Sequence, residues 1–376
     1  MSDDPFTTLG AIVRAANEKL SAKAWDYLIG GAEMEATIAR NRQGLDSLAF
    51  RPRVLRDMRK VDLSRKFLGH ALRMPVLLAP IGGLTTLHPD GPLAVARAAE
   101  EFGTMSFLGS GGAVKEHPLD EVRAAGRAPM GYQLYVRGDD DWVYAQVQKT
   151  VDLGFQAFGL TVDTAATAQR ERELVHGYDR RVEKNKGRGD DRLRITWELI
   201  EGIKRRFDIP LVIKGIATAE DAQAAVEARV DVIYVSNHGG RSMDQGRGTI
   251  DVLPEVAAVA KGKAAIVVDG GFFRGSDVVK GLARGADAVA IGKLQGWGLA
   301  AGGKDGIVAV LTLLEAEIRT NMILLGVDAI GNLGPRCLHP AAPVVRPDVF
   351  SAFPQYVIPT VRPQNESHPA SEWRSA

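Results

Sequence analysis

The stretch VIYVSNHGGR (232–241) decides the fold. Its first four residues are apolar and mostly β-branched, which predicts a buried strand, and Asn237 with the two glycines then ends that strand in a turn. His238 and Arg241 are therefore expected just past the strand's C-terminal end. A histidine there can exchange protons near neutral pH, and an arginine can hold a carboxylate through two parallel hydrogen bonds. The alternative is a plain turn in which both side chains only satisfy neighbouring backbone.

Seven further apolar runs accompany this one, at 75–79, 104–108, 130–134, 157–162, 210–213, 265–268 and 287–291. Stretches with helical periodicity lie between the runs, such as 92–102 and 218–228, and the second opens with Thr218 and Asp221 in the pattern of a capping box. Eight strand–helix units predict an α/β protein, a closed (β/α)8 TIM barrel. An open doubly wound sheet is the alternative, but the turn at 80–83 lacks its dinucleotide-binding glycine spacing.

The chain divides into three parts that we expect to form one domain. Residues 1–50 have helical periodicity and 51–73 are basic and irregular, so 1–73 is predicted to be a helical segment that packs on the barrel. The barrel itself should span 74–335. The last part, 336–376, is Pro-rich and polar, and we expect it to wrap a neighbouring molecule or to be disordered.

Composition excludes several classes of function. The chain has 376 residues with Lys+Arg 47 and Asp+Glu 46, a formal charge of +1, so no overall field favours nucleic acid or an anionic membrane. Its one cysteine, Cys337, allows neither an internal disulfide nor a thiolate metal cluster, and no metal is expected. No apolar run is long enough to span a bilayer, and the start lacks a secretory pattern. These features predict a soluble, cytoplasmic protein.

Chemistry in such barrels gathers at the rim where strands meet the following loops. The candidate rim residues, taken strand by strand, are Pro80, Ile81 and Gly82; Ser110 and Gly111; Gln133 and Tyr135; Thr161, Asp163 and Arg170; Lys214; Ser236, His238 and Arg241; Asp269, Gly270 and Gly271; Gly292 and Lys293. Each alone has a plain alternative: Gln133 as a core amide, Asp163 as a helix cap, Lys214 as a solvated side chain. Polar groups after nearly every strand are hard to explain by packing, because burying an unpaired charge is costly.

Two of these loops suggest a bound phosphate. Residues 269–271 and 292–293 follow the seventh and eighth runs, where barrels commonly bind phosphate through backbone N–H groups and a helix N-terminus. Glycine lets the backbone approach an anion closely.

Longer motifs carry a family resemblance: WDYLIGGAE (25–33), ARNR (39–42), FRPRVL (50–55), MPVLLAP (74–80), HPDGPLAVARAA (88–99), YQLYV (132–136), LTVDT (160–164), IPLVIKGI (209–216), VSNHGGR (235–241) and VDGGFFRGSDVVKGLARGADAV (268–289). Over about residues 10 to 335 the chain resembles the FMN-dependent α-hydroxy-acid oxidase and dehydrogenase family, which includes glycolate oxidase, lactate oxidase, lactate monooxygenase and mandelate dehydrogenase.

The resemblance implies a role for each substrate-facing residue. His238 would be the base that removes a proton from the substrate, and Asp163 would orient the imidazolium and stabilise it. Arg241 and Arg170, helped by the Tyr27 hydroxyl, would hold the substrate carboxylate. A further residue, Tyr135, would hydrogen-bond the substrate hydroxyl or the developing ketone.

The resemblance also implies an FMN site. Lys214 would stabilise negative charge on the reduced ring near its N1–C2 edge. Gln133, Thr161 and Ser236 would contact the ring or the ribityl chain, and residues 80–82 would pass over N5. The remaining cofactor-binding residues would be Ser110, Asp269, Gly270, Gly271, Arg274, Gly292 and Lys293.

The chain departs from the family pattern at four of these places. Residues 270–275 correspond to the family's GGxRRG pattern, with Phe273 in place of the first arginine. The Gly-Arg that usually follows the eighth strand is here Gly292-Lys293. Both changes predict weaker binding of the FMN phosphate. Gly111 stands where glycolate oxidases carry a tryptophan, which predicts a pocket larger than glycolate needs. Gly82, alanine in many members, leaves space beside N5 and is shared with lactate-monooxygenase-like members.

The loop after the fourth strand is unusual too. Residues 171–194 are mostly charged with few apolar anchors, which predicts a mobile rim loop. The family's PxxGxR pattern is absent before Arg170, so its placement is less constrained than that of Arg241. His176 is expected to be a solvated surface residue.

These features predict FMN-dependent oxidation of an L-2-hydroxy acid to the 2-oxo acid in a homotetramer or larger assembly, with dioxygen, a quinone or another carrier as acceptor. Three alternatives stay open: oxidative decarboxylation of the lactate-monooxygenase kind, a flavin-binding barrel without turnover, and a flavin-free isomerase or aldolase that uses Lys214 as a Schiff-base nucleophile.

Overall fold

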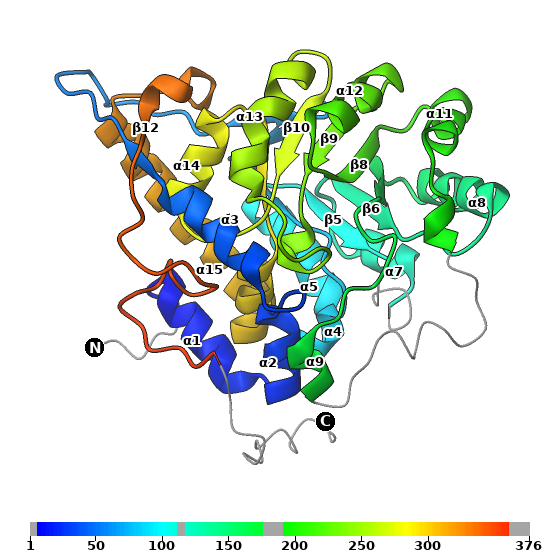
Figure 1. The fold of residues 1–376 in the computed structure, drawn as a ribbon, viewed down its shortest axis with the longest axis horizontal. Helices are drawn as coiled ribbons and strands as arrows, with labels where there is room; N and C mark the ends of the chain where they lie inside the picture. Colours follow the sequence, from blue (N-terminus) through cyan, green and yellow to red (C-terminus); the bar gives the residue numbers. More distant parts are fainter. Residues whose placement is uncertain (1–5, 111–116, 176–190, 361–376) are drawn as a thin grey trace.

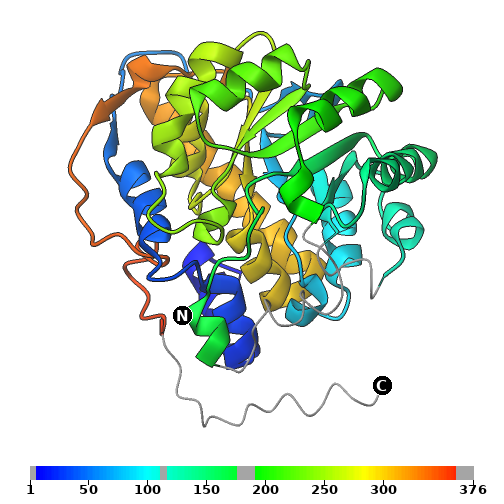
Figure 2. The same ribbon diagram turned by 45° about the vertical axis from the view of Figure 1, so that its right-hand side comes forward.

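A closed barrel of eight parallel strands forms the centre of the computed structural model, which describes residues 6–110, 117–175 and 191–360 (Figures 1 and 2). The strands are β4 (Val76–Leu78), β5 (Ser106–Gly109), β6 (Met130–Leu134), β7 (Ala157–Thr161), β8 (Leu211–Ile216), β9 (Val232–Val235), β10 (Ala265–Val268) and β11 (Ala288–Ile291). They pair in chain order, and β11 closes on β4. The predicted (β/α)8 barrel is confirmed, and the open sheet is excluded.

Helices surround this barrel and follow its strands. They are α4 (Leu84–Leu87), α5 (Gly91–Phe102), α7 (Leu119–Ala124), α8 (Asp140–Asp152), α9 (Glu171–Val175), α11 (Trp197–Arg206), α12 (Ala219–Glu227), α13 (Thr249–Ala260), α14 (Gly275–Ala283) and α15 (Lys293–Leu325). The helix predicted from Thr218 begins as expected: the Thr218 hydroxyl accepts a hydrogen bond from the backbone N–H of Asp221 at 3.1 Å. Strands and helices bury a continuous apolar layer between them.

A short hairpin fills the N-terminal end of the barrel. Strands β2 (Arg65–Phe67) and β3 (His70–Leu72) pair antiparallel, in a segment that we expected to be irregular. Phe67 and Leu72 are buried in the same apolar cluster as inward-facing barrel residues such as Phe107 and Tyr234. The hairpin therefore closes the end of the barrel opposite the loops that follow the strands.

The N-terminal helices cover part of the rim at the other end. They are α1 (Leu9–Lys19), α2 (Ala22–Ile29) and α3 (Ala36–Asp46), as the helical periodicity of 1–50 predicts. Figure 1 shows α3 passing in front of α14 and α15, and α2 beside α9. Strand β1 (Leu48–Phe50) then pairs antiparallel with β12 (Leu338–Pro340) and ties the two ends of the chain together.

The C-terminal part packs on its own chain as far as residue 360. Phe350 stacks on Trp25 with ring centroids 5.6 Å apart, and Phe353 lies against Phe273 and Trp297 at 6.1 and 6.0 Å. The Trp25 indole donates a hydrogen bond to a backbone carbonyl near the end of this segment, at 3.2 Å. This differs from the wrapped or disordered tail that its composition suggested, because two phenylalanines anchor it; residues 361–376 lie outside the described part of the chain.

No helix in the described ranges is long and apolar enough to cross a membrane.

Candidate active site

The turn after β9 places His238 at the C-terminal rim. It forms a short 3-10 helix, η2 (His238–Gly240), and the Asn237 side chain accepts a hydrogen bond from the Gly240 N–H at 3.1 Å. His238 itself has a left-handed backbone with φ +59°, an uncommon conformation for a bulky residue. Gly240, with φ +77°, packs so closely on α3 that a Cβ there would lie 2.6 Å from Ile38. The strand-ending residues therefore build a tight turn, as the sequence predicted.

Both ring nitrogens of His238 have a partner. Nε2 lies 3.1 Å from the Tyr135 hydroxyl, and Nδ1 lies 3.1 Å from Oδ1 of Asp163. Burial lowers the pKa of His238, and the nearby Asp163 carboxylate only partly opposes this. Burial works against the charged form of Asp163 as well, but His238 and Lys214 outweigh it and lower the pKa of that carboxyl. The pair is thus a neutral imidazole that a carboxylate orients, which is the arrangement of a general base.

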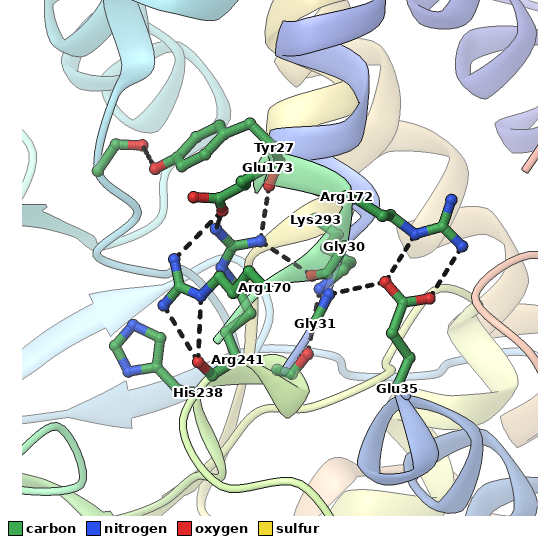
Figure 3. Close-up of polar contacts among 12 residues, drawn as sticks. Tyr27, Gly30, Gly31, Glu35, Arg170, Arg172, Glu173, His238, Arg241 and Lys293 are labelled. Atoms are coloured by element: carbon green, nitrogen blue, oxygen red, sulfur yellow. Dashed lines mark hydrogen bonds and ion pairs between the residues drawn. The ribbon is translucent and has the colours of Figure 1, made fainter. Parts of the chain in front are cut away.

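The two arginines converge beside this histidine (Figure 3). Arg241 donates to the carbonyls of Tyr27 and Gly30 at 2.6 and 2.9 Å, and Arg170 donates through Nη2 to the Arg241 carbonyl at 3.1 Å. Oε1 of Glu173, on α9, lies 2.8 Å from Nη2 of Arg241 and 3.3 Å from Nη1 of Arg170. The two guanidiniums thus lie close enough to share one carboxylate.

Tyr27 reaches the same cluster from α2. Its hydroxyl donates to the Gly82 carbonyl at 2.7 Å, and the Arg241 guanidinium lies over its ring at 4.9 Å from the centroid. A helix outside the barrel therefore joins the loop after β4 to the loop after β9, so that Tyr27, Gly82 and Arg241 share one site.

Lys214 belongs to a buried chain of polar groups. Its ammonium donates to the Ser236 hydroxyl at 2.7 Å, which in turn donates to Oδ1 of Asp269 at 2.7 Å. The ammonium also lies 3.6 Å from the other oxygen of Asp269. The Ser236 hydroxyl accepts a hydrogen bond from the His238 N–H at 3.0 Å, which links the cation to the turn that carries the base.

Two residues at the rim carry buried polar atoms that could form hydrogen bonds with a flavin ring. In the described structure the Gln133 amide and the Thr161 hydroxyl are buried without a hydrogen-bond partner. Gln133 lies one residue before the end of β6 and Thr161 ends the neighbouring strand β7, and burial of these polar groups without a partner is costly. The edge of a flavin ring offers both donors and acceptors that such groups could pair with. Ser110, which directly follows β5, accepts a hydrogen bond from the backbone N–H of Tyr135 at 2.9 Å and closes this side of the site.

The backbone conformation of residues 80–82 and of the two glycine loops suits a closely approaching ligand. Pro80, Ile81 and Gly82 directly follow β4, and Gly292 precedes α15. Gly270 and Gly271 have φ of +102° and +84°, which only glycine adopts readily. Asn41 of α3 packs against both of them, so that the phosphate-binding candidate loop is supported from outside the barrel.

Lys293 supplies a cation in the second glycine loop, 292–293. Its ammonium donates to the Gly239 carbonyl at 3.1 Å. Burial first, and then the positive charge of Arg241, lower the pKa of Lys293 to about 7. It is thus only half charged near neutral pH in the protein without a ligand.

Two residues of the loop after β10 contact α15. Arg274, which we expect to bind the cofactor, pairs through its guanidinium with Oε1 of Glu317 on α15 at 2.5 Å, and its contact with FMN stays a prediction. Phe273, which replaces the usual arginine, is buried against Trp297 at 5.1 Å between ring centroids. At the position where the family pattern has an arginine, Phe273 therefore makes an aromatic contact with α15.

Two expected residues lie outside the described part of the chain, namely Gly111 and His176. Our sequence reasoning missed one charged residue of the site, Glu173. Its position three residues after Arg170 was a usable signal, because residues three apart share a face of a helix. We instead treated the charged segment as a solvated loop, and α9 shows that its first turn is ordered.

A (β/α)8 barrel with a histidine–carboxylate pair, two arginines and a lysine at its C-terminal rim is an enzyme architecture suited to small acids. Residues 16–340 match the family model described as FMN-dependent dehydrogenase, so the chain belongs to that family. Its cofactor is therefore FMN, and the protein is an FMN-dependent oxidoreductase. Membership sets aside the flavin-free isomerase or aldolase.

Curated relatives agree with this assignment over nearly their full length. The chain is 34% identical to the peroxisomal (S)-2-hydroxyacid oxidase of Arabidopsis thaliana over 349 residues, which is 88% of this chain and 95% of that protein. It is 35% identical to the L-lactate oxidase of Nostoc sp. (86% and 95%), and 34% identical to the 4-hydroxymandelate oxidase of Amycolatopsis orientalis (87% and 96%).

Solved structures of mandelate oxidase have the same fold. A crystal structure of that enzyme with benzoyl-formic acid superposes with a TM-score of 0.81 at 34% identity and covers 90% of this chain and 99% of the other.

Proposed function

We propose that the protein oxidises an L-2-hydroxy acid to the corresponding 2-oxo acid. The observation that carries the proposal is the imidazole of His238, which lies between the Tyr135 hydroxyl and the Asp163 carboxylate at 3.1 Å from each. Arg170 and Arg241 lie beside it with guanidiniums close enough to share a carboxylate. A proton acceptor next to a carboxylate clamp is the arrangement that a 2-hydroxy acid requires.

The chain's own residues would carry the proton step. His238 has a lowered pKa through burial, so it is neutral near pH 7 and can take a proton from the substrate. Asp163 then stabilises the imidazolium, so that protonation of His238 costs less free energy than it would in a pocket without a negative charge. Tyr135, whose pKa burial raises well above its usual value, stays protonated and can donate a hydrogen bond to the substrate oxygen.

FMN, when bound, accepts the two electrons that leave the substrate. Gln133 and Thr161 would hold the ring edge, and Lys214 would stabilise negative charge on the reduced ring from its chain with Ser236 and Asp269. The phosphate would rest on the loops at 270–271 and 292–293. Lys293 is the cation of the second loop, while Arg274, which follows the first loop, pairs with Glu317.

The pocket would take an acid larger than glycolate. The support is Gly111, which stands where glycolate oxidases carry tryptophan, together with the names of the relatives, which include mandelate and 4-hydroxymandelate oxidases. The electron acceptor would be dioxygen, a quinone or another carrier. We also propose a homotetramer or larger assembly, which sedimentation of the FMN-loaded protein would test.

One experiment tests the reaction. The FMN-loaded protein is mixed without oxygen with both enantiomers of glycolate-like, lactate-like and mandelate-like acids, and the flavin absorbance is followed. We expect bleaching by the L-enantiomers and fastest reduction by a bulky acid. Bleaching by none of these acids would contradict the oxidation and favour a flavin-binding barrel without turnover.

The second half of that experiment admits air and identifies the products. A 2-oxo acid with hydrogen peroxide is expected from an oxidase, whereas slow reoxidation by air with fast reoxidation by a quinone indicates a dehydrogenase. Gly82, in the loop after β4, favours a second candidate, oxidative decarboxylation, which would release carbon dioxide and a shortened acid instead.

A further inference from the structure

One carboxylate of the protein already occupies the space between the two arginines. Oε1 of Glu173 lies 2.8 Å from Nη2 of Arg241 and 3.3 Å from Nη1 of Arg170, and both ion pairs are visible in Figure 3. Only 5% of the surface of Glu173 is exposed, so this contact lies inside the site and not on its rim. These are the contacts that a substrate carboxylate would make in the proposed function.

Glu173 is held there by its neighbour in α9. Arg172 points the other way and forms a two-pronged ion pair with Glu35, at 2.6 Å from Nε to Oε1 and 2.9 Å from Nη2 to Oε2. Glu35 also accepts a hydrogen bond from the Gly31 N–H at 3.0 Å, and Arg172 donates to the carbonyl of Thr360. Figure 3 shows the two ion-pair groups on either side of residues 30–31.

Backbone carbonyls also bind the two arginines. Arg241 donates to the carbonyls of Tyr27 and Gly30, and Arg170 donates to the carbonyl of Arg241, so the backbone fixes both guanidiniums. Glu173, on the short helix α9, is a charged partner of both guanidiniums. A second carboxylate beside it in a buried site would be repelled, because like charges interact strongly where the effective dielectric constant is low.

We propose that Glu173 is an affinity-determining residue: its carboxylate fills the carboxylate subsite of the substrate-free enzyme, and the carboxylate of the 2-hydroxy acid displaces it. The inference rests on the proposed function. Substrate binding then exchanges one carboxylate for another on the same two guanidiniums. Displacement of Glu173 reduces the net free energy of substrate binding, while His238 and its partners keep their positions.

The test is the affinity of FMN-loaded variants for unreactive carboxylates. Pyruvate and benzoylformate serve as probes, and the dissociation constant is read from the change in flavin absorbance on titration. Glu173→Gln keeps the shape and removes the charge, so we expect both probes to bind about tenfold tighter or more.

Glu171→Gln is the matched control, since Glu171 lies in the same helix, is exposed and carries the same charge. It should leave both dissociation constants unchanged. Unchanged or weaker probe binding in Glu173→Gln would overturn the proposal and make Glu173 a support for the arginines. If Glu173→Gln does not fold, Arg172→Gln carries the test: it releases α9 from Glu35 and should also tighten probe binding, and weaker binding would count against the proposal.

The readouts separate this inference from the proposed function. Probe binding needs no turnover, so tighter binding in Glu173→Gln together with a flavin that no 2-hydroxy acid reduces would leave the subsite assignment standing and refute the oxidation. Normal flavin reduction by a 2-hydroxy acid, together with equal probe affinities in wild type and Glu173→Gln, would support the oxidation and refute the subsite assignment.

Discussion

His238 combines an uncommon left-handed backbone with two occupied ring nitrogens, so its imidazole has one orientation. Replacing His238 with Ala should lower the rate of anaerobic flavin reduction by roughly 10²–10⁴-fold, the usual contribution of a general base. The FMN content of the variant should stay the same, because the His238 imidazole pairs with Tyr135 and Asp163 rather than with the loops that would hold the FMN phosphate. Stopped-flow absorbance measures the rate, and a variant reduced as fast as wild type would refute His238 as the base.

The pH dependence of reduction follows from the same residue. Burial lowers the pKa of His238 below its usual 6.5, and the base must be neutral, so kred/Kd should be flat above pH 6.5 and fall only at lower pH. The Asp163 charge raises that pKa, so Asp163→Asn should move the acid limb to still lower pH and reduce the plateau. A limb centred above pH 6.5 in wild type would assign the titration to another group.

Lys293 should make FMN binding depend on pH. Its pKa is lowered to about 7 mainly by burial, and a phosphate dianion favours the charged form, so binding takes up a proton above pH 7. The dissociation constant of FMN should therefore rise between pH 7 and 9, by up to about tenfold per pH unit. Equilibrium dialysis at each pH measures it.

Lys293→Arg supplies the control for that dependence. Arginine stays charged across this range, so its FMN affinity should be independent of pH and tighter at pH 9 than that of wild type. A flat profile in wild type, or a slope that persists in Lys293→Arg, would show that Lys293 does not hold the phosphate.

At this scale the sequence identified the residues and missed some of their partners. His238, Asp163 and Tyr135 follow strands of one closed barrel and Lys214 lies in the C-terminal half of β8, so these side chains lie together, and strand ends can be predicted from apolar runs. The pairing of Arg274 with Glu317 joins residues that only the packing of α14 on α15 brings together. Such a contact depends on tertiary structure, and local spacing does not encode it.

The strand β8 has a local irregularity on which the site depends. Its pairing with β9 shifts in register between Lys214 and Ile216, at Gly215, which has φ +115°. A Cβ at Gly215 would lie 2.6 Å from Cβ of Asp163, so the bulge leaves just enough room for the carboxylate that orients the base.

Gly215→Ala should therefore act on stability and on catalysis together. We expect a loss of roughly 1–3 kcal/mol in the free energy of unfolding, because the backbone is strained and Asp163 must move. Flavin reduction should slow as well. Gly262→Ala is the control, since Gly262 has φ +82° with no atom within 4 Å of the added Cβ, so it tests the backbone effect alone. Equal effects of both substitutions on reduction would argue against the contact with Asp163.

Elements with a strong repeating pattern were the predictable ones. All eight barrel strands were found because buried parallel strands are continuous apolar runs. The hairpin of β2 and β3 and the pair of β1 with β12 were not, since each strand has three residues and no periodicity can show in so short a segment. Their stability comes from burial of Phe67 and Leu72 and from the closure of the chain ends.

At the scale of the whole molecule, aromatic side chains pack the C-terminal segment against the loops that would hold the cofactor. Phe353 contacts Phe273, which follows the glycine pair 270–271, and Trp297, which lies one turn after Lys293. The Pro-rich composition of 336–376 suggested disorder, but the rings of Phe350 and Phe353 anchor its described part. The segment therefore supports both loops that would hold the FMN phosphate.

Phe353→Ala should test that support. Removing a buried ring of this size costs about 3–5 kcal/mol in the free energy of unfolding, and the thermal midpoint should fall accordingly. Because the cavity opens against Phe273 and Trp297, the dissociation constant of FMN should rise at the same time. Val357→Ala, a change at a side chain that is 96% exposed in the same segment, should alter neither quantity. Differential scanning fluorimetry and FMN titration measure the two effects. A variant that loses stability but binds FMN as tightly as wild type would show that the segment stabilises the fold without supporting the cofactor loops. The aromatic cluster around Phe273, which stands where the family pattern has an arginine, would then contribute to packing and not to FMN binding.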